Sequence, residues 1–309
     1  MRLIFMGTPE AAVPTLQRCL EDGHHLVSVW TQPDRPAGRG YKLIQPPVKE
    51  FALIHGLNVD QPQKIKTEQA RELFASYEAD VAVVVAYGRI LPTSFLSAPR
   101  LGCINVHFSL LPLYRGAAPV AWAIIRGDEE TGVTTMKIEE GLDTGPILLQ
   151  RATKIGQEES ATELMKRLAI EGAELLSETL CRFDQIEPRA QDESRFTLAP
   201  SLKKEDGLID WTLDAFHIER RVRGLQPWPN AFTAYKGMRL AISRARAELI
   251  EGQKSAAGSV IAAHGDKMSV ACGENTILHL VEVQPEGRRR MSVRDYLNGV
   301  HLSAGEILG

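Results

Sequence analysis

The stretch INVHFSLLPLYRG, residues 104–116, places an amide and an imidazole two residues apart at the end of an apolar run. Side chains at positions i and i+2 of a β-strand point to the same face, so Asn105 and His107 should project side by side. A carboxylate, Asp143, follows in the glycine-flanked loop GLDTG, residues 141–145. These groups suit acyl transfer: an amide donates to a developing oxyanion, an imidazole accepts a proton, and a carboxylate orients the imidazole.

The same residues also have ordinary structural interpretations. A single histidine at a strand end is often a hydrogen-bonded core residue, and Asp-x-Gly is a common turn. A metal site built on His107 and Asp143 is disfavoured, because no third His, Cys or carboxylate follows at ligand spacing, and we expect no metal. No Ser or Cys occupies a nucleophile elbow, which favours direct transfer between two bound substrates over a covalent acyl-enzyme. The stretch ends in residues that we expect to lie exposed, namely Tyr114, Arg115 and Gly116.

The elements around these residues predict an α/β domain. Short runs rich in Val and Ile alternate with helical patterns, as expected for parallel strands covered on both faces. Ligands of such sheets gather at the carboxyl ends of the strands, where Asn105 and His107 lie. The expected strands are residues 2–7, 25–31, 80–86, 102–107 and 131–138, and the expected helices are residues 9–22, 67–78 and 159–183.

The pattern of apolar residues changes in the last third of the chain. Residues 185–206 are polar and irregular, with Pro188 and Pro200, and predict a linker after a first domain of residues 1–184. Residues 207–309 contain short alternating runs separated by glycine-containing turns, which is typical of an antiparallel sheet or a small barrel.

Length and composition indicate an ordinary two-domain protein, with 309 residues of which 44% are hydrophobic and 24% charged. The segment RLIFMG is too short for a signal peptide, and no apolar run approaches the ~18 residues of a membrane span. We therefore expect a cytoplasmic protein with no membrane partner, and a monomer. The four cysteines lack C-x-x-C spacing, which predicts reduced thiols.

Positive charge is distributed unevenly. The net charge is −3, but residues 207–309 hold 13 Lys and Arg against 11 Asp and Glu, whereas residues 1–206 hold 23 against 28. Segment 31–49 is rich in Pro and Gly, which predicts a loop without helix or strand. Two interpretations of its basic residues stay open, a solvated loop or an arm that closes on a polyanion. Its basic residues are Arg35, Arg39, Lys42 and Lys49.

Longer motifs resemble one enzyme family. The pattern N-V-H-x-S-L-L-P-x-Y-R-G-A-A-P, together with GVTTMKIEEGLDTGPIL, is similar to the signature of formyltransferases that use 10-formyltetrahydrofolate. The segments FMGTPE, TQPDRPAGRG, VVVAYGRILP, LIDW, LQPWPNAFTA and QPEGRRRMS resemble the members that act on methionyl-tRNA, in order along nearly the whole chain. Phe108 departs from the pattern, which has a small residue there. Two interpretations stay open: the bulky ring narrows the site, or it faces the core, because side chains alternate along a strand.

The resemblance implies a Rossmann-like catalytic domain and a C-terminal OB-like barrel that helps to hold tRNA. It implies transfer of the formyl group of 10-formyltetrahydrofolate to the α-amine of methionyl initiator tRNA, for translation initiation. The family's catalytic residues match Asn105, His107 and Asp143. The folate-binding residues that the resemblance implies are Val85, Ala86, Tyr87, Gly88, Ile90, Leu91, Ser109, Leu110, Leu111, Pro112, Gly141 and Leu142. The implied tRNA-binding residues are Arg35, Arg39, Lys42, Lys204, Arg288, Arg289 and Arg290.

Alternatives remain at this point. A formyltransferase for an amino sugar or a sugar nucleotide would keep the same three catalytic residues. A non-enzymatic tRNA-binding protein is a more distant alternative, and the intact Asn, His and Asp argue against it. The sequence also leaves open whether His107, Asp143 or a water between them takes the proton of the attacking amine.

Overall fold

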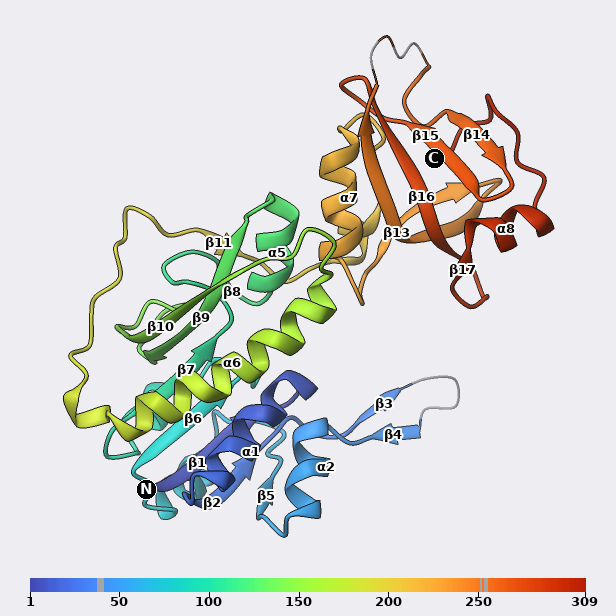
Figure 1. Cartoon of the computed structure of the whole chain (residues 1–309). Helices are drawn as coiled ribbons and strands as arrows, with labels where there is room; N and C mark the ends of the chain where they lie inside the picture. The colour runs from blue at the N-terminus through green and yellow to red at the C-terminus, as the bar shows by residue number, and fades with distance from the viewer. Residues whose placement is uncertain (38–41, 251, 253–254) are drawn as a thin grey trace. The chain divides into compact units, whose positions relative to one another are not determined.

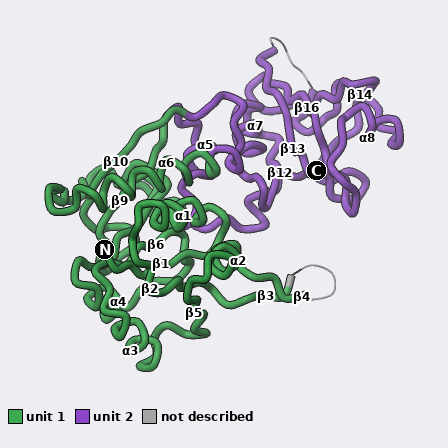
Figure 2. The backbone as a smooth tube through the Cα atoms, turned by 60° about the horizontal axis from the view of Figure 1, so that its bottom comes forward, with its two compact units in different colours: residues 1–116, 130–154, 165–199 green, residues 117–129, 155–164, 200–309 purple. Residues whose placement is uncertain are grey.

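The structure is a computed structural model that describes all residues except 38–41, 251, 253 and 254. The described chain divides into two compact units (Figure 2). Unit 1 contains residues 1–116, 130–154 and 165–199, and unit 2 contains residues 117–129, 155–164 and 200–309. No helix in these described ranges is long and apolar enough to cross a bilayer.

Unit 1 is built on a seven-stranded sheet with the order β10-β9-β7-β6-β1-β2-β5 (Figure 1). The five strands from β5 to β7 are parallel, and β9 and β10 add antiparallel pairs at one edge. Every residue of β6 is buried, which explains why its sequence is wholly apolar. The strands are β1 Arg2–Gly7, β2 His25–Trp30, β5 Val59–Asp60, β6 Val81–Val85, β7 Cys103–His107, β9 Glu130–Lys137 and β10 Ile147–Lys154.

Helices cover the sheet of unit 1. On one face, the aromatic rings of Phe74 and Phe95 pack edge-on against Trp30, with centroid distances of 5.2 and 5.6 Å. On the other face, the long helix α6 runs across the strands (Figure 1), and a Cβ at Gly172 would lie 2.9 Å from Val106. The helical segments are η1 Glu10–Ala12, α1 Val13–Glu21, α2 Pro47–Ile54, α3 Glu68–Ser76, α4 Thr93–Leu96, α6 Ala161–Cys181 and η2 Phe183–Gln185.

Unit 2 contains an antiparallel sheet with the order β12-β13-β16-β15-β14, and β17 pairs with β16. Burial alternates along β12, as expected for a sheet with one face on the core. Gly224 allows α5 and α7 to approach closely, since a Cβ there would lie 2.6 Å from Ile125. The elements are α5 Pro119–Arg126, η3 Lys204–Gly207, α7 Ala215–Gly224, β12 Ala231–Tyr235, β13 Met238–Leu249, β14 Val260–His264, β15 Lys267–Ala271, β16 Thr276–Pro285, β17 Met291–Ser292 and α8 Val293–Gly299.

These units confirm the predicted fold class, a Rossmann-like α/β sheet followed by an antiparallel C-terminal domain. The prediction for segment 31–49 was wrong. Strands β3 Arg35–Ala37 and β4 Lys42–Ile44 pair as a hairpin, and α2 begins at Pro47. Proline is tolerated in these places, because a two-stranded ribbon leaves each strand a free edge and the first turn of a helix needs no donor.

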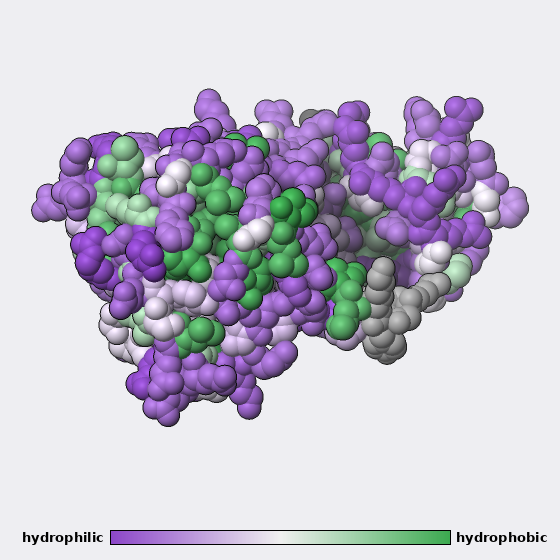
Figure 3. Space-filling view, turned by 90° about the horizontal axis from the view of Figure 1, so that it is seen from below, coloured by the Kyte–Doolittle hydropathy of each residue, from purple (hydrophilic) through white to green (hydrophobic). Residues whose placement is uncertain are grey.

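The face of the molecule drawn in Figure 3 mixes hydrophilic regions with separate hydrophobic patches. The most exposed large apolar side chains of α2 and β4 are Ile54 and Leu43, at 81% and 62% exposure. Exposed apolar side chains of this kind are usual on globular proteins, and we assign them no role.

Candidate active site

Strand β7 presents Asn105 and His107 on one face of the sheet. His107 is buried and Asn105 is half-buried, and no hydrogen bond to the Asn105 side chain is found within the described part of the chain. Cys103 lies on the same face, but burial raises the pKa of its thiol to about 12, so it is no nucleophile at neutral pH. Phe108 packs toward α6, with its ring 3.4 Å from the position of a Gly172 Cβ, and therefore faces away from the site.

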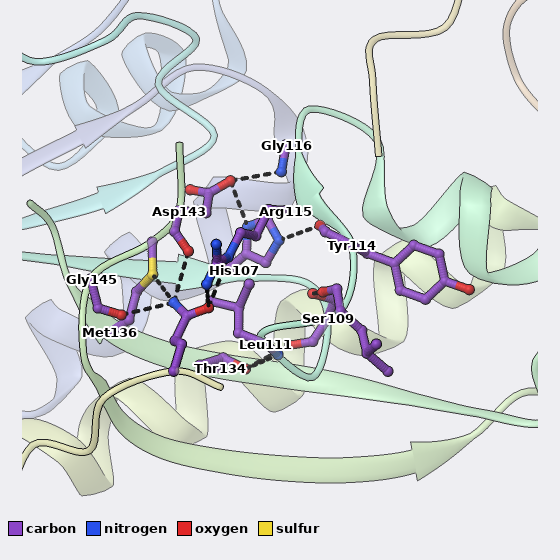
Figure 4. Close-up of polar contacts among 12 residues, drawn as sticks. His107, Ser109, Leu111, Tyr114, Arg115, Gly116, Thr134, Met136, Asp143 and Gly145 are labelled. Carbon is purple, nitrogen blue, oxygen red and sulfur yellow. Dashed lines mark hydrogen bonds and ion pairs between the residues drawn. The ribbon is translucent and has the colours of Figure 1, made fainter. Parts of the chain in front are cut away.

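The imidazole of His107 is hydrogen-bonded at one nitrogen and lies beside a carboxylate at the other (Figure 4). Its Nε2 lies 2.9 Å from the carbonyl oxygen of Tyr114, and its Nδ1 lies 3.8 Å from Oδ2 of Asp143. A carbonyl only accepts hydrogen bonds, so Nε2 must carry a proton. Nδ1 is therefore the ring atom that can take up and release a proton, and the carboxylate beside it stabilises positive charge on the ring.

Asp143 is fixed by the loop that carries it. Its backbone has φ +53°, a left-handed conformation that is uncommon for a residue with a side chain. Its Oδ2 accepts a hydrogen bond of 2.8 Å from the backbone N–H of Gly116. Gly145 permits the tight return of the loop, because a Cβ there would lie 1.9 Å from the carbonyl oxygen of Lys137. The glycine-flanked sequence is thus a steric requirement of the loop.

Two further side chains belong to the site. Gln191 is buried, and its Nε2 donates to the carbonyl oxygens of Asp143 and Gly145 over 2.7 and 2.8 Å. Its Oε1 accepts from the guanidinium of Arg115. Gln191 lies in the polar segment expected to link the domains, and no motif of the sequence pointed to it. The expectation that Arg115 and Tyr114 lie exposed was wrong, since they are 3% and 5% exposed.

Comparison with known proteins decides the family. A profile described as "Formyl transferase" matches residues 1–180, and one described as "Formyl transferase, C-terminal domain" matches residues 201–301. A methionyl-tRNA formyltransferase of Solibacter usitatus is 48% identical over 100% of this chain and 99% of its own length. One of Methylococcus capsulatus is 48% identical over 100% of both chains. The chain belongs to the methionyl-tRNA formyltransferase family.

Solved structures share the fold. The methionyl-tRNA formyltransferase of Clostridium thermocellum matches 82% of this chain and 95% of its own, with TM-score 0.56 and 20% identity. WlaRD, a sugar 3N-formyl transferase, matches 94% and 99%, with TM-score 0.67 and 16% identity. HypX of Aquifex aeolicus in complex with tetrahydrofolic acid matches 96% of this chain, with TM-score 0.64 and 17% identity. The chain spans about half the length of HypX, 47% of that chain.

The residues that the formyltransferase resemblance assigns to folate lie in three segments of unit 1. In the segment after β6, Tyr87 and Leu91 are buried, whereas Ile90 is 77% exposed. Leu142, in the Asp143 loop, is 54% exposed. A hydrogen bond of 2.6 Å from Thr93 Oγ1 to Glu140 brings these two segments together. The other residues that the resemblance assigns to folate in these three segments are Val85, Ala86, Gly88, Ser109, Leu110, Leu111, Pro112 and Gly141.

A surface cavity lies beside the segment after β6. Its volume is about 460 Å³, within the range of small-molecule sites. Ile90 and Leu91 line it together with residues 65–68 and 92–94 and Arg71. Among the described residues, no group of three or more His, Cys, Asp or Glu side chains could hold a metal ion.

The residues assigned to tRNA belong to both units. Arg35 is exposed in β3 and donates to Gln32 Oε1 over 3.2 Å. Lys42 starts β4, and Arg39 lies outside the described residues. In unit 2, Lys204 is exposed in η3, Arg288 and Arg289 are exposed in the turn after β16, and Arg290 pairs with Glu282.

Proposed function

We propose that this protein transfers the formyl group of 10-formyltetrahydrofolate to the α-amine of methionyl initiator tRNA. The observation that carries the proposal is the match along the whole chain to relatives named methionyl-tRNA formyltransferase. The grouping of His107 and Asp143 at the end of β7, with Asn105 on the same strand, supplies the chemistry that such a transfer requires. The product, formylmethionyl-tRNA, starts translation.

Asn105 serves the developing oxyanion. When bound, 10-formyltetrahydrofolate supplies the formyl carbon that the amine attacks, and the formyl oxygen then gains negative charge. The Asn105 amide is half-buried and has no partner among the described residues, so its N–H groups are available to that oxygen. One such donor contributes about 3 kcal/mol to transition-state stabilisation in comparable sites.

His107 takes the proton that the attacking amine must lose. It returns that proton to N10 of the folate as the C–N10 bond breaks, so that formylmethionyl-tRNA and tetrahydrofolate are the products. Its Nδ1 faces Asp143, while the Tyr114 carbonyl holds Nε2, so the ring accepts the proton at a defined atom. Asp143 stabilises the imidazolium that results, and its own position is set by the Gly116 N–H. Protonation at Nδ1 places the positive charge directly beside the carboxylate.

The folate is proposed to lie against the segment after β6 and the Asp143 loop. Ile90 and Leu142 expose large apolar side chains that suit the faces of a flat ring. The Thr93 to Glu140 hydrogen bond keeps the two segments together. The proposed contacts include all twelve residues named above for folate.

The tRNA is proposed to contact basic residues of both units, namely Arg35, Arg39, Lys42, Lys204, Arg288, Arg289 and Arg290. Phosphate contacts are made by Lys and Arg, and residues 207–309 carry the more basic balance. We propose that residues 1–184 form the catalytic domain, that residues 185–206 follow as a linker, and that residues 207–309 support tRNA. We also propose that the protein works as a monomer in the cytoplasm.

Formylation assays test the proposal. The purified full chain is incubated with 10-formyltetrahydrofolate and, in separate reactions, with methionyl initiator tRNA or an amino-sugar nucleotide. We expect kcat/KM for the tRNA to exceed that for the sugar by about 1000-fold or more, since a site that uses remote binding energy loses rate with a truncated acceptor. A preference for the amino sugar would contradict the proposal and favour a sugar formyltransferase.

A further inference from the structure

We infer that Gln191 is a positioning residue for transfer, which acts through Asp143 and does not touch the substrates. The inference rests on the proposed function, because it concerns the same site. Gln191 lies in a segment of residues 191–199 that contacts the loop carrying Asp143 and the loop of residues 114–116 that orients His107. We name residues 191–199 the brace segment.

Both ends of the Gln191 side-chain amide are hydrogen-bonded to other residues of the protein. Nε2 donates to the carbonyl oxygens of Asp143 and Gly145, and Oε1 accepts from Nε and Nη2 of Arg115 over 3.0 and 2.8 Å. The orientation of the amide is unambiguous, since carbonyls require a donor and a guanidinium requires an acceptor. A buried amide bonded in this way fixes the atoms that it joins.

The two hydrogen bonds from Gln191 Nε2 hold the part of the Asp143 loop whose backbone is in an unfavourable, left-handed conformation. Asp143 has φ +53°, and such backbone persists only where its surroundings fix it. Gln191 bonds the carbonyl of Asp143 itself and that of Gly145, the residue that returns toward β9. Loss of both bonds would free the carboxylate to move relative to His107.

The other end of the brace segment holds the loop that orients His107. Thr197 accepts from the Tyr114 N–H at Oγ1, over 2.8 Å, and from the Arg115 N–H at its carbonyl oxygen, over 2.9 Å. Strand β11, Leu198–Ala199, then pairs with β8, Arg115–Gly116. The Tyr114 carbonyl holds His107 Nε2, and the Gly116 N–H holds Asp143, so both catalytic side chains depend on this pairing.

Arg115 fastens the brace segment in place. Its guanidinium is buried and bonds the Glu193 carboxylate over 2.6 and 3.1 Å, in addition to Gln191. It also lies 5.2 Å from the centroid of the Phe196 ring. If the segment detached, Arg115 would be left without these partners, which is costly for a buried charge. The brace segment is therefore a fixed part of the site.

The test uses the full-length enzyme with Gln191→Leu, which keeps the approximate size and removes the side-chain hydrogen bonds to Asp143, Gly145 and Arg115. We expect kcat to fall by about 100-fold, as a displacement of about 1 Å in a catalytic group does. KM for folate and for tRNA should each stay within about 3-fold, because neither substrate touches Gln191 and the Thr93 to Glu140 hydrogen bond still holds the folate-facing part of the loop. Gln191→Glu keeps the acceptor for Arg115 but loses both donors, so its kcat should also fall by about 10-fold or more.

A matched control exists in unit 2. Gln226 donates to the carbonyl oxygens of Val222 and Ser243 over 3.0 and 2.9 Å, so Gln226→Leu removes the same kind of bond in the unit that does not contain the proposed catalytic residues. Its kcat should stay within about 2-fold of the wild type, even where its Tm falls. If Gln191→Leu does not fold, Gln191→Glu decides the question.

A double-mutant cycle separates positioning from general destabilisation. In an Asp143→Asn background, single-turnover rates with excess enzyme should change by less than about 3-fold when Gln191→Leu is added, because the group that Gln191 positions is already disabled. If the rate of the double variant is reduced by the product of the two single-variant reductions, the inference is overturned. A wild-type kcat in Gln191→Leu would also overturn it. A wild-type enzyme that does not formylate methionyl-tRNA would instead refute the proposed function, before any variant is compared.

Discussion

At the scale of single residues, the contact between His107 Nε2 and the Tyr114 carbonyl fixes the tautomer of the neutral ring. We predict that His107 carries its proton on Nε2 in the resting enzyme. Two-bond ¹⁵N–¹H NMR of histidine-labelled protein distinguishes the tautomers, and loss of the signals in His107→Gln assigns them. A resting Nδ1–H tautomer would contradict the geometry on which the proposed proton acceptor rests.

The residues of the site were predicted unequally. Asn105 and His107 were predictable as neighbours, because side chains two residues apart on a β-strand point to the same face of the sheet. Gln191 was not predictable, because its role depends on hydrogen bonds to Asp143 and Gly145 that span more than 40 residues of chain. Arg115 was expected to be exposed and is buried, since the residues that cover it also come from the distant brace segment.

At the scale of elements, the ion pair of Glu193 with Arg115 ties the brace segment to β8. The hydrogen bond from Arg115 lowers the pKa of Glu193, so the pair stabilises the fold above the usual carboxyl range and loses this effect as the pH falls through the lowered pKa. We predict that Glu193→Gln lowers Tm at pH 7 by about 1–2 °C, a small effect because Glu193 is largely exposed. The Tm difference from the wild type should shrink as the pH falls below the usual carboxyl range and should vanish once the Glu193 carboxylate is protonated in the folded protein. A constant difference across this pH range would show that the charge is not involved.

Strands were predictable where the apolar composition of a short segment by itself reports that the segment is buried. The apolar runs that became β1, β2, β6 and β7 are buried on both faces, and their composition reports this directly. The hairpin of β3 and β4 was missed, because Pro36 argues against a strand unless the strand has a free edge. Whether a strand has a free edge depends on the tertiary structure, and the sequence of the segment alone does not show it.

At the scale of the whole molecule, recognition of tRNA should depend on charge in both units. We predict that Arg39→Ala raises KM for methionyl-tRNA or lowers turnover, while Kd for folate is unchanged. Each phosphate contact that is lost should reduce the slope of log Kd for tRNA against log salt by about one unit. Arg288→Ala and Arg289→Ala should act in the same direction but more mildly.

Titration of tRNA binding across a salt series measures these slopes. Lys267→Ala, which lies in β15 outside the proposed tRNA residues, is a useful comparison for the loss of a positive charge in unit 2. If Arg39→Ala shows unchanged tRNA kinetics at every salt concentration, segment 31–49 does not contact tRNA. That result would also strengthen the case for a small acceptor.

The most direct test of the proposed transfer is the single-turnover rate of formylation by Asn105→Ala, measured beside its Kd for 10-formyltetrahydrofolate. The wild type should formylate methionyl initiator tRNA, and the variant should be slower by about 100-fold or more, because the amide donates to an oxyanion that exists only during transfer. Its Kd for the folate should stay within about 3-fold of the wild-type value. A near-normal rate in Asn105→Ala would remove Asn105 from the site and contradict the proposed mechanism.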